Sequence, residues 1–583
     1  MPQDRAIPTS RPTTVLTTLI KVNGIDMPEK YKTEAIAITH EVNRIPTAKL
    51  VIIDGTASGE KFEASNDIMF VPGSEVEIKA GYQSDNHLLF QGIIIKHNIK
   101  VRSNGSSVMV IECRDKTIKM TIGKKNKYFS EVKDSEAIEE IVSSYSGLSI
   151  DAQATDVTQK QLVQYDCTDW DFMLSRADVN QRLCIVDNGK INIKTPDLTP
   201  SPVLTLVYGA SILELDLEID ARLQQTQVTT FAWNSDDQEV AEQLMDNPNI
   251  SVAGNITADE LAAATAPSAY ELKHGGELPE QELEAWGNSL WIKRQLAKVR
   301  GKVNFKGTHE VKTGNIIELQ GVGNRFTGKL FVSGVQHQIS AGDWQTVTQV
   351  GLNPDWFTDL YDVSSKPASG LLPAINGLHT GIVTQLENDP DAKNRIKVFL
   401  PIIHKGEEGI WTRVATLDAG KERGSFFLPE IGDEVIVGFI NDDPRNAVLL
   451  GMVNSSAKPA PVKATDTNHI KGFVTRSKIK MLFDDENKSY TLETPGGKKL
   501  VLDDNANEIR IEDNNGNKLV MDSNGIKIES NGKIEMKAAM DFNTEGMNLT
   551  SKANASFKAS GTTSAELSSG VNTVIKGTMV QIN

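Results

Sequence analysis

Short segments in which polar and apolar residues alternate crowd the stretch from residue 395 to residue 454. Residues 395–399, 410–414 and 434–439 each alternate along their length, and clusters of turn residues separate them. The turns are Asp418-Ala419-Gly420, Glu430-Ile431-Gly432-Asp433 and Asn441-Asp442-Asp443-Pro444. Alternation with a period of two, bounded by turn residues, predicts antiparallel strands. About sixty residues of such strands suit a small closed barrel of the OB type, which we place within residues 377–456.

Strand patterns also fill two longer regions nearer the N-terminus. Residues 1–125 contain repeated alternating or apolar segments separated by turn signals such as Asn23-Gly24, which predicts a β-barrel-like domain. Residues 206–365 predict a second β-barrel-like domain, interrupted by an acidic insertion at residues 234–276, where we expect surface loops with short helices. Residues 366–376 lose the pattern and predict a linker.

Three helices are predicted among these strands. Residues 126–205 mix strand and helix patterns, and two of the helices fall there, one from residue 137 and one from residue 173. The candidate N-caps are Ser135 or Asp134 for the first helix and Thr168 or Asp169 for the second. Trp170 and Phe172 are expected to pack in the core. The third helix is predicted over residues 280–300, where apolar residues recur at a spacing of three to four.

The C-terminal region, residues 480–583, changes to short alternating strands with polar turns, after a neck at residues 457–479. The strands recur roughly every eight residues, which is typical of a β-solenoid. Their expected starts are Leu500, Ile509, Leu519, Ile526 and Ile534. One or two apolar residues per strand cannot enclose a core within one chain, so we expect three chains to form a triple-stranded β-helix, a trimeric prism.

The end of this region admits two interpretations. From Ser551 onward the chain is rich in Ser, Thr, Ala, Gly and Asn, a composition that favours disorder in a single chain. Alternation nevertheless continues through Phe557, Leu567 and Val574, and small residues suit a narrowing prism. About a dozen strands stacked at roughly 4.8 Å would give a needle on the order of 60 Å long.

Composition excludes several classes of protein. The chain has 583 residues, 39% hydrophobic and 24% charged, which predicts a soluble multidomain protein. A formal net charge of −16 argues against a general nucleic-acid binder. Three cysteines without metal-ligand spacing fit a reducing compartment. Because the N-terminus lacks the apolar core of a signal peptide, we expect synthesis and assembly in the cytoplasm without a signal peptide.

Candidate chemistry is sparse. Asp169 and Asp171 lie two residues apart and invite an acid–base interpretation, but capping and core packing of their helix is the simpler explanation. His337 lies on an alternating strand without nearby Cys, Asp or His in the sequence, which favours a structural role. Gly321 and Gly323 lack the βαβ unit of a dinucleotide loop. We therefore expect no enzyme activity, no cofactor and no metal site.

Ordered motifs resemble those of the VgrG family and of contractile-phage tail spikes. The OB motifs of that family match Arg395 to Pro401, Trp411 to Val414, Gly432 to Phe439, Asp443 to Arg445 and Leu450-Gly451. An N-R-I-P-x-A turn starts at Asn43, and a Q-Y-x-x-T-D-W-D-F segment starts at Gln164. The resemblance covers nearly the whole chain. It implies a mainly β protein with a hub region of two β-barrel-like domains and short helices, an OB-fold barrel and the C-terminal prism.

The resemblance also implies a function. A homotrimeric spike of a contractile injection system, either a type VI secretion system or a phage-tail-like particle, would join the inner tube and baseplate proteins. Sheath contraction would drive the needle through a target membrane, with effectors as cargo, and eject the baseplate component into the target cell or medium. Two other functions stay open: a spike with cell-wall hydrolase activity, and an OB-type glycan or nucleic-acid binder.

The needle tip is the predicted partner-binding site. A prism that ends at residue 583 exposes unpaired strand ends, which a partner can extend by β pairing. The family resemblance implies a PAAR-type tip protein there, since the final histidine, His469, precedes the prism and leaves no imidazole ligand for a metal at the apex. A blunt, uncapped end is the alternative. The predicted contact residues are Thr578, Met579, Val580, Gln581, Ile582 and Asn583.

Overall fold

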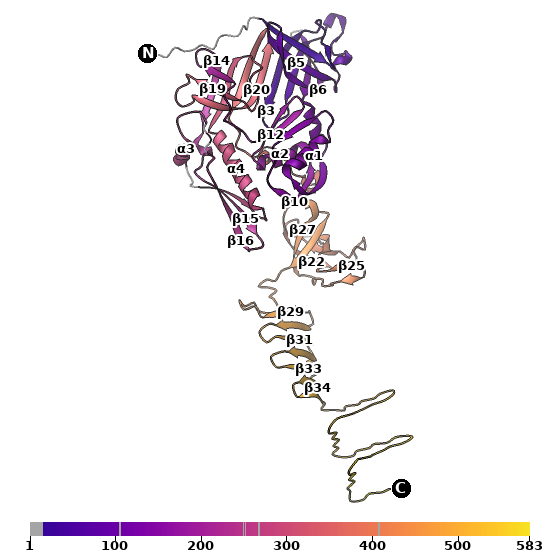
Figure 1. Ribbon diagram of the computed structural model, residues 1–583. Helices are drawn as coiled ribbons and strands as arrows, with labels where there is room; N and C mark the ends of the chain where they lie inside the picture. Colours follow the sequence, from indigo (N-terminus) through magenta and orange to yellow (C-terminus); the bar gives the residue numbers. More distant parts are fainter. Residues whose placement is uncertain are drawn as a thin grey trace. The chain divides into compact units, whose positions relative to one another are not determined.

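The computed structural model describes residues 15–103, 106–248, 250, 252–265, 269–405 and 408–582. The chain divides into two compact units, which we describe separately. The first comprises Met1–Asn376 with Asn441–Pro444, and the second comprises Gly377–Ile440 with Arg445–Asn583. Strands dominate both units, as predicted (Figure 1). None of the helices in the described ranges combines the length and apolar character that a membrane span requires.

A 13-stranded sheet organises the described part of the first unit. Its main path runs β14 (Ile212–Ile219), β18 (Val299–Lys306), β21 (Asp343–Val350), β20 (Gly328–Ser340), β3 (Thr33–Glu41), β4 (Thr47–Ile53), β7 (Ser107–Arg114), β6 (Asp85–Val101), β5 (Glu75–Tyr82), β1 (Leu16–Val22) and β2 (Ile25–Asp26). Off this path, β19 (Ile316–Gln320) pairs with β20 and with β13 (Leu204–Val207). The antiparallel pairing of β20 with β3 joins the two predicted β-rich regions in one sheet.

The side chain of Trp344 shows why these two regions associate. It lies on β21 with 1% of its surface exposed, and it packs in a core whose other members include Ile38, Leu50 and Phe90 from residues below 114. Its indole stacks on Tyr82 with ring centroids 5.5 Å apart. Burial of large aromatic surface is a strong favourable term in folding, so this residue couples the C-terminal strands of the sheet to the N-terminal ones.

Smaller elements complete the first unit. The helices are α1 (Asp134–Ser143), α2 (Asp169–Val179), α3 (Ala258–Thr265), α4 (Glu280–Leu296) and α5 (Phe357–Leu360), and the short 3-10 turns include η1 (Ala57–Gly59), η2 (Ile68–Phe70), η3 (Lys116–Thr121) and η4 (Ala221–Leu223). The small sheets are β8 (Lys125–Lys133) with β10 (Thr158–Cys167); β9 (Ser149–Ala152), β12 (Lys190–Lys194) and β11 (Leu183–Asp187); and β16 (Glu239–Met245), β15 (Val228–Asn234) and β17 (Tyr270–His274). All three cysteines are free thiols.

The predicted N-caps of the first two helices had different outcomes. Thr168 caps α2, since its hydroxyl accepts a hydrogen bond from the Asp171 backbone N–H at 3.1 Å. The prediction for α1 was wrong by at least one residue, because α1 begins at Asp134 after Lys133. Glu136 there reaches back to accept a bond from the Lys133 backbone N–H at 2.9 Å. Both candidate caps lie inside the helix instead.

The third predicted helix is shorter than expected, and the insertion is more ordered. Helix α4 ends at Leu296, because Val299–Lys306 forms β18 between β14 and β21. Within residues 234–276 the expected short helix is α3, but β16 and β17 pair with β15 where loops were predicted. This small sheet packs on α4 around Gly287, where an added Cβ would lie 2.6 Å from the Met245 Cγ. The close approach of helix and sheet therefore requires glycine.

In the second unit, the predicted OB-type barrel is confirmed. Strands β22 (His379–Gln385), β23 (Ile396–Phe399), β24 (Ile410–Val414), β28 (Ala447–Met452) and β27 (Glu434–Phe439) form a closed barrel in that order. Its core is made of alternate strand residues, among them Val383, Val398 and Val437. A short hairpin of β25 (Ala419–Gly420) and β26 (Arg423–Gly424) projects from the connection between β24 and β27.

A 7-stranded antiparallel sheet follows the barrel, and we call it the needle sheet. Its strands, stacked as successive rungs in Figure 1, are β29 (Ile470–Val474), β30 (Lys480–Asp484), β31 (Ser489–Glu493), β32 (Lys499–Asp503), β33 (Glu508–Glu512), β34 (Lys518–Asp522) and β35 (Gly525–Glu529). The first strand falls within the range predicted as a neck. Successive strands start 10, 9, 10, 9, 10 and 7 residues apart, slightly more than the predicted spacing.

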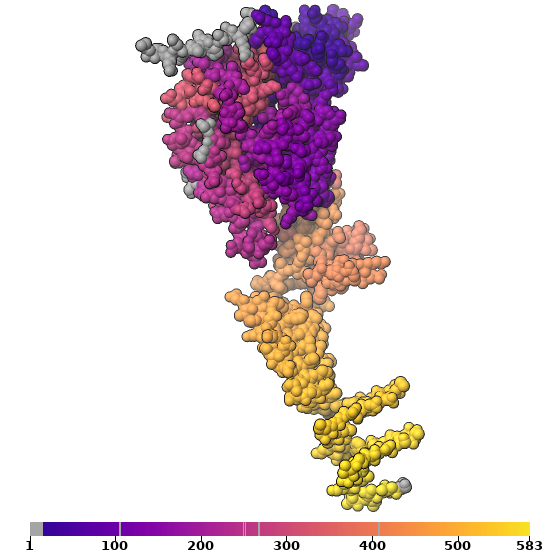
Figure 2. Space-filling model, in the orientation of Figure 1, coloured from indigo at the N-terminus to yellow at the C-terminus, as the bar shows by residue number. Residues whose placement is uncertain are grey.

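Residues 530–582 continue as extended chain, which Figure 2 shows as narrow projecting runs. Within this described range the chain forms no strand with itself, and Ile534 does not start one. Its large apolar side chains are exposed, for example Met540 at 91% and Met547 at 99%. The strands predicted here remain a prediction for an assembly in which neighbouring chains pair with this segment.

Candidate assembly surfaces

One face of the needle sheet carries two columns of large apolar side chains. The cross-strand register aligns Phe473, Met481, Leu492, Leu500, Ile511, Leu519 and Ile528 in one column. The second column contains Phe483, Tyr490, Leu502, Ile509, Met521 and Ile526. Because side chains two residues apart on a strand share a face, both columns lie on the same side of the sheet. We call this side the apolar needle face.

The apolar needle face is open to solvent in the single chain. Ile511 is 49% exposed, Ile528 is 53% exposed and Leu502 is 42% exposed. A groove of about 610 Å³ follows the first column and is lined by Leu492, Leu500, Ile511, Leu519, Ile528 and Ile534 among others. Contiguous apolar surface of this kind marks a protein interaction site in soluble proteins.

The opposite face of the needle sheet forms ion pairs within the chain. Directly opposed residues alternate in charge along one column of Lys480, Glu493, Lys499, Glu512, Lys518 and Glu529. In the centre, Val501 and Val520 are buried on either side of Arg510, which forms ion pairs with Glu508 and Glu512. Opposite charges across strands stabilise a sheet. The sheet thus has a charged side that forms ion pairs of its own and an apolar side without a partner in the described chain.

An exposed aromatic cluster links the OB barrel to this face. Phe427, in the connection that follows β26, stacks on Phe473 of β29 with ring centroids 5.2 Å apart. Phe427 is 58% exposed and its neighbour Phe426 is 82% exposed. These two phenylalanines were not predicted as contact residues, although two adjacent aromatics in a polar loop were a visible signal.

The predicted tip residues lie at the end of the extended segment. Met579 is 85% exposed, Val580 is 49% exposed and Ile582 is 87% exposed. Thr578 and Gln581 belong to the same extended run, and Asn583 lies outside the described residues. Exposure by itself does not identify a partner, so the role of these residues in binding a tip protein stays a prediction.

The two aspartates considered for catalysis are held by separate partners. Asp169 is buried and accepts hydrogen bonds from Gln164 at 2.8 Å and from Tyr145 at 2.6 Å, and it pairs with Lys125. Burial alone would raise the pKa of the Asp169 carboxyl, but these donors outweigh burial and lower it. Asp171 instead accepts a bond from the Thr168 hydroxyl at 2.6 Å. Each aspartate thus has partners of its own, and the helix cap predicted for Thr168 is confirmed.

His337 is a buried structural residue, as predicted. Its side chain is 4% exposed, and its Nδ1 lies 3.1 Å from the Thr346 hydroxyl of the neighbouring strand. Burial lowers the pKa of His337 to about 3, with smaller contributions from His40 and His309. The imidazole is therefore neutral at pH 7. Within the described ranges, no group of three or more His, Cys, Asp or Glu side chains is arranged to hold a metal ion.

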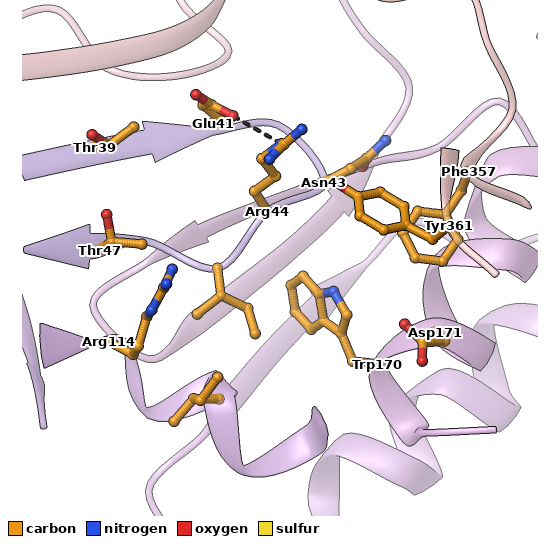
Figure 3. Close-up of a pocket in the computed structure, with 12 residues that line it drawn as sticks. Thr39, Glu41, Asn43, Arg44, Thr47, Arg114, Trp170, Asp171, Phe357 and Tyr361 are labelled. Carbon is orange, nitrogen blue, oxygen red and sulfur yellow. Dashed lines mark ion pairs between the residues drawn. The ribbon is translucent and has the colours of Figure 1, made fainter. Parts of the chain in front are cut away.

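A cavity of about 370 Å³ opens in the first unit where two sequence motifs meet (Figure 3). Asn43, Arg44 and Ile45 come from the turn between β3 and β4, and Trp170 and Asp171 come from the start of α2. The remaining lining residues are Thr39, Glu41, Thr47, Arg114, Ile118, Phe357 and Tyr361. Both motifs stand out in the sequence, but their meeting was not predicted, and Arg114 at the end of a strand was missed.

Three family models match successive parts of the chain. A family model described as the Alg8 N-terminal domain matches residues 12–341, more than half of the chain. A model described as the type VI secretion system/phage-baseplate injector OB domain matches residues 379–453. A third, the phage baseplate V C-terminal trimerisation domain, matches residues 489–583. The second and third matches coincide with the OB barrel and with most of the needle region.

Curated relatives match only a small part of the chain. The type VI secretion system spike protein VgrG1b of Pseudomonas aeruginosa is 29% identical over 113 residues, which are 18% of this chain and 15% of that protein. The spike protein VgrG3 of Vibrio cholerae is 34% identical over 80 residues, 13% of this chain and 8% of that protein. The chain thus spans less than a fifth of the length of these relatives.

A solved Escherichia coli component of the type VI secretion system is 12% identical, and its match covers 74% of this chain and 99% of that one with a TM-score of 0.37. That score is too low to support an argument about function. The OB-domain and trimerisation-domain models match residues 379–453 and 489–583, and the curated relatives are VgrG spike proteins. Because the Alg8 N-terminal domain model matches more than half of the chain, the chain belongs to the family that this model describes. The matches to the OB-domain and trimerisation-domain models and to the VgrG relatives identify it as a VgrG-like spike of the type VI secretion and phage-baseplate kind.

Proposed function

We propose that this chain is the structural spike of a contractile injection system and that it works as a homotrimer. The observation that carries the proposal is the asymmetry of the needle sheet. Its charged face pairs its own residues, whereas the apolar needle face leaves side chains such as Ile511 and Ile528 about half exposed. Burying a Leu or Ile side chain fully contributes about 1.5–3 kcal/mol. Three copies that turn these faces inward form a closed prism with no free lateral edge.

The extended segment supports the same arrangement. Residues 530–582 have no strand partner within the described chain, yet they expose pairs of large apolar side chains two residues apart: Ile534 and Met536, Met540 and Phe542, and Met547 and Leu549. Backbone groups of a strand need partners when they are buried. Neighbouring copies would supply them, and the match of residues 489–583 to a trimerisation domain supports this step.

The work of the assembled spike is mechanical. We place the hub, formed by residues 1–365, on the inner tube and baseplate, the OB barrel at residues 377–456, and the needle at residues 480–583 on the target side. Sheath contraction supplies the energy and drives the needle through the target membrane. The needle contributes stiffness, because every rung of a continuous β ladder is hydrogen-bonded to the next. Under this proposal the chain assembles in the cytoplasm and leaves with the baseplate complex.

The tip is proposed to hold a PAAR-type protein. The exposed apolar residues Met579, Val580 and Ile582 end the described chain, and effectors carried by such a tip protein would be cargo of the spike. We assign no catalytic role, because the two candidate aspartates serve α2 and its surroundings. No observation in the described residues favours a cell-wall hydrolase or an OB-type glycan or nucleic-acid binder.

The mass of the purified chain in solution tests the proposal. Light scattering coupled to size exclusion should give three times the chain mass of 63.8 kDa. A monomer at concentrations where the protein is folded and soluble would contradict it.

A further inference from the structure

The cavity in the first unit is lined by a row of hydrogen-bond donors from three neighbouring strands. Thr39 of β3 lies directly across from Thr47 of β4, and Thr47 lies directly across from Arg114 of β7. Directly opposed residues on adjacent strands project to the same face of a sheet. All three side chains line the cavity, and Figure 3 shows Arg114 below Thr47 on one side with Trp170 facing them.

The acceptors that line this cavity are already used within the chain. The Glu41 carboxylate accepts from the Arg44 Nε at 2.9 Å. The Asn43 Oδ1 accepts from the Cys184 backbone N–H at 2.8 Å, and the Asp171 carboxylate accepts from the Thr168 hydroxyl at 2.6 Å. Arg44 itself also lies with its guanidinium 6.0 Å from the Tyr361 ring centroid.

The hydrogen-bond donors of the row, in contrast, have no partner within the described residues. Within the described residues, the Arg114 guanidinium forms no ion pair or hydrogen bond, and neither do the hydroxyls of Thr39 and Thr47. In the same part of the structure the Trp170 indole N–H has no acceptor. A half-buried arginine without a partner beside two free hydroxyls is a site for an acceptor that carries negative charge.

The side chains that form the walls of the cavity indicate which kind of group carries the negative charge. Ile45, Ile118, Trp170, Phe357 and Tyr361 supply apolar and aromatic surface. Among the described lining residues only one guanidinium is uncommitted, which matches a monoanion rather than a doubly charged phosphate. The planar fork of arginine fits a carboxylate with two parallel hydrogen bonds.

We infer that this cavity binds a carboxylate group borne on a short apolar or aromatic stem. Arg114 and Thr47 bind the carboxylate, and Trp170 contacts the stem. Two sources can supply such a carboxylate. One is an acidic side chain or chain end of a second copy in the assembled spike, and the other is a free small acid. A chain with a net charge of −16 offers many carboxylates to its own copies.

The probe for this site is 4-fluorophenylacetate, observed by fluorine NMR with the full-length chain as purified. The matched control ligand, 4-fluorophenylacetamide, has the same ring and lacks the charge. We expect line broadening and a shift for the acid alone. Arg114→Gln should weaken binding of the acid about tenfold or more, and Thr47→Val should weaken it less. Arg102→Gln, which removes an exposed arginine paired with Glu34, is the control variant and should bind as the parent does.

The outcomes separate the two sources. Binding of the acid to the purified chain assigns the carboxylate to a free acid. If the acid does not bind but Arg114→Gln lowers the assembled mass or the melting temperature relative to Arg102→Gln, the carboxylate comes from a second copy. The inference is wrong if acid and amide bind equally, or if Arg114→Gln binds the acid as tightly as the parent. It is also wrong if the acid fails to bind and Arg114→Gln changes neither mass nor melting temperature.

Discussion

Ile511 lies directly across from Leu519 on the apolar needle face, while Arg510, the residue before Ile511, turns to the other face and pairs with Glu508 and Glu512. A single strand therefore contributes both to the surface that needs a partner and to the surface that does not. This relationship repeats along the needle sheet, and it decides where a substitution should disturb assembly.

Replacing Ile511 and Ile528 together with Asp should prevent trimer formation. In the proposed prism the double variant places about six unpaired charges in the interior, and each costs several kcal/mol. Light scattering should show the mass fall to that of a single chain, 63.8 kDa. Lys527→Asp, on the charged face next to Ile528, is the matched control and should stay assembled. A double variant that remained trimeric and as protease-resistant as the parent would refute the prism.

Deleting residues 578–583 should abolish co-purification with a PAAR-type tip protein. The deletion removes Met579, Val580 and Ile582, the exposed apolar side chains at the end of the described chain. The mass should remain that of the assembled parent, because the needle sheet at residues 470–529 is unchanged. Retention of the tip protein by the shortened chain would place its binding site elsewhere. Stoichiometric zinc or iron in the purified chain alone would also contradict a separate metal-bound cap.

Stability of the hub should fall as the pH falls below about 6.5. Burial lowers the pKa of His337 to about 3, so between its unfolded and folded values the unfolded chain binds a proton that the folded chain does not. The contribution of His337 to the free energy of unfolding is fully present above the pKa that His337 has in the unfolded chain. It is lost progressively as the pH falls toward 3. The loss from His337 alone should be about 2–3 kcal/mol at pH 4.5.

Urea unfolding at pH 7.5 and pH 4.5, followed by tryptophan fluorescence, measures this loss. Trp344 is one of the seven tryptophans that contribute to this signal, and its ring centroid lies 5.8 Å from that of His337. His337→Gln should reduce the difference between the two midpoints. His274→Gln, at an exposed position on β17, should leave it as in the parent. An equal pH effect in all three proteins would exclude His337 as its source.

Arg176→Met should destabilise the first unit strongly. Arg176 donates to Asp134 at 2.6 and 2.9 Å and to Glu282 at 2.8 Å, which ties α2 to α1 and α4. Asp134 is 1% exposed. Removing one partner leaves buried charge uncompensated, and we expect a cost of about 3–5 kcal/mol. Arg102→Met breaks an exposed pair and should cost about 1 kcal/mol or less. Similar melting temperatures for the two variants would show that the Arg176 ion pairs do not hold the three helices together.

The purified chain should not hydrolyse peptidoglycan. Hydrogen bonds from Gln164, Lys125 and Tyr145 outweigh burial and lower the pKa of the Asp169 carboxyl, so it stays ionised near neutral pH and cannot donate a proton as a general acid. A zymogram and a soluble-fragment assay on purified peptidoglycan measure this. Hydrolysis that disappears in the double variant Asp169→Asn, Asp171→Asn would overturn the assignment of a purely mechanical role.

The sequence by itself determined the local structure and the periodicity. Alternation along residues 395–399 and 434–439 predicted the strands of the OB barrel, and the low number of apolar residues per strand predicted that the needle needs partners. Such patterns are visible because the side chains of a strand alternate between its two faces whatever the strand packs against. The Thr168 cap of α2 was predictable for the same reason, since a cap depends on residues three positions apart.

Tertiary structure alone decided which distant residues meet. Nothing local predicts that Thr39, Thr47 and Arg114 form one row, because strand register depends on the pairing of three strands separated in sequence. The same holds for the packing of Trp344 on residues of the N-terminal strands. The start of α1 was missed because Asp134 serves Arg176 on α2 rather than its own helix terminus. A side chain's neighbours in sequence set its local conformation, but its partner is set by the long-range pairing that buries it.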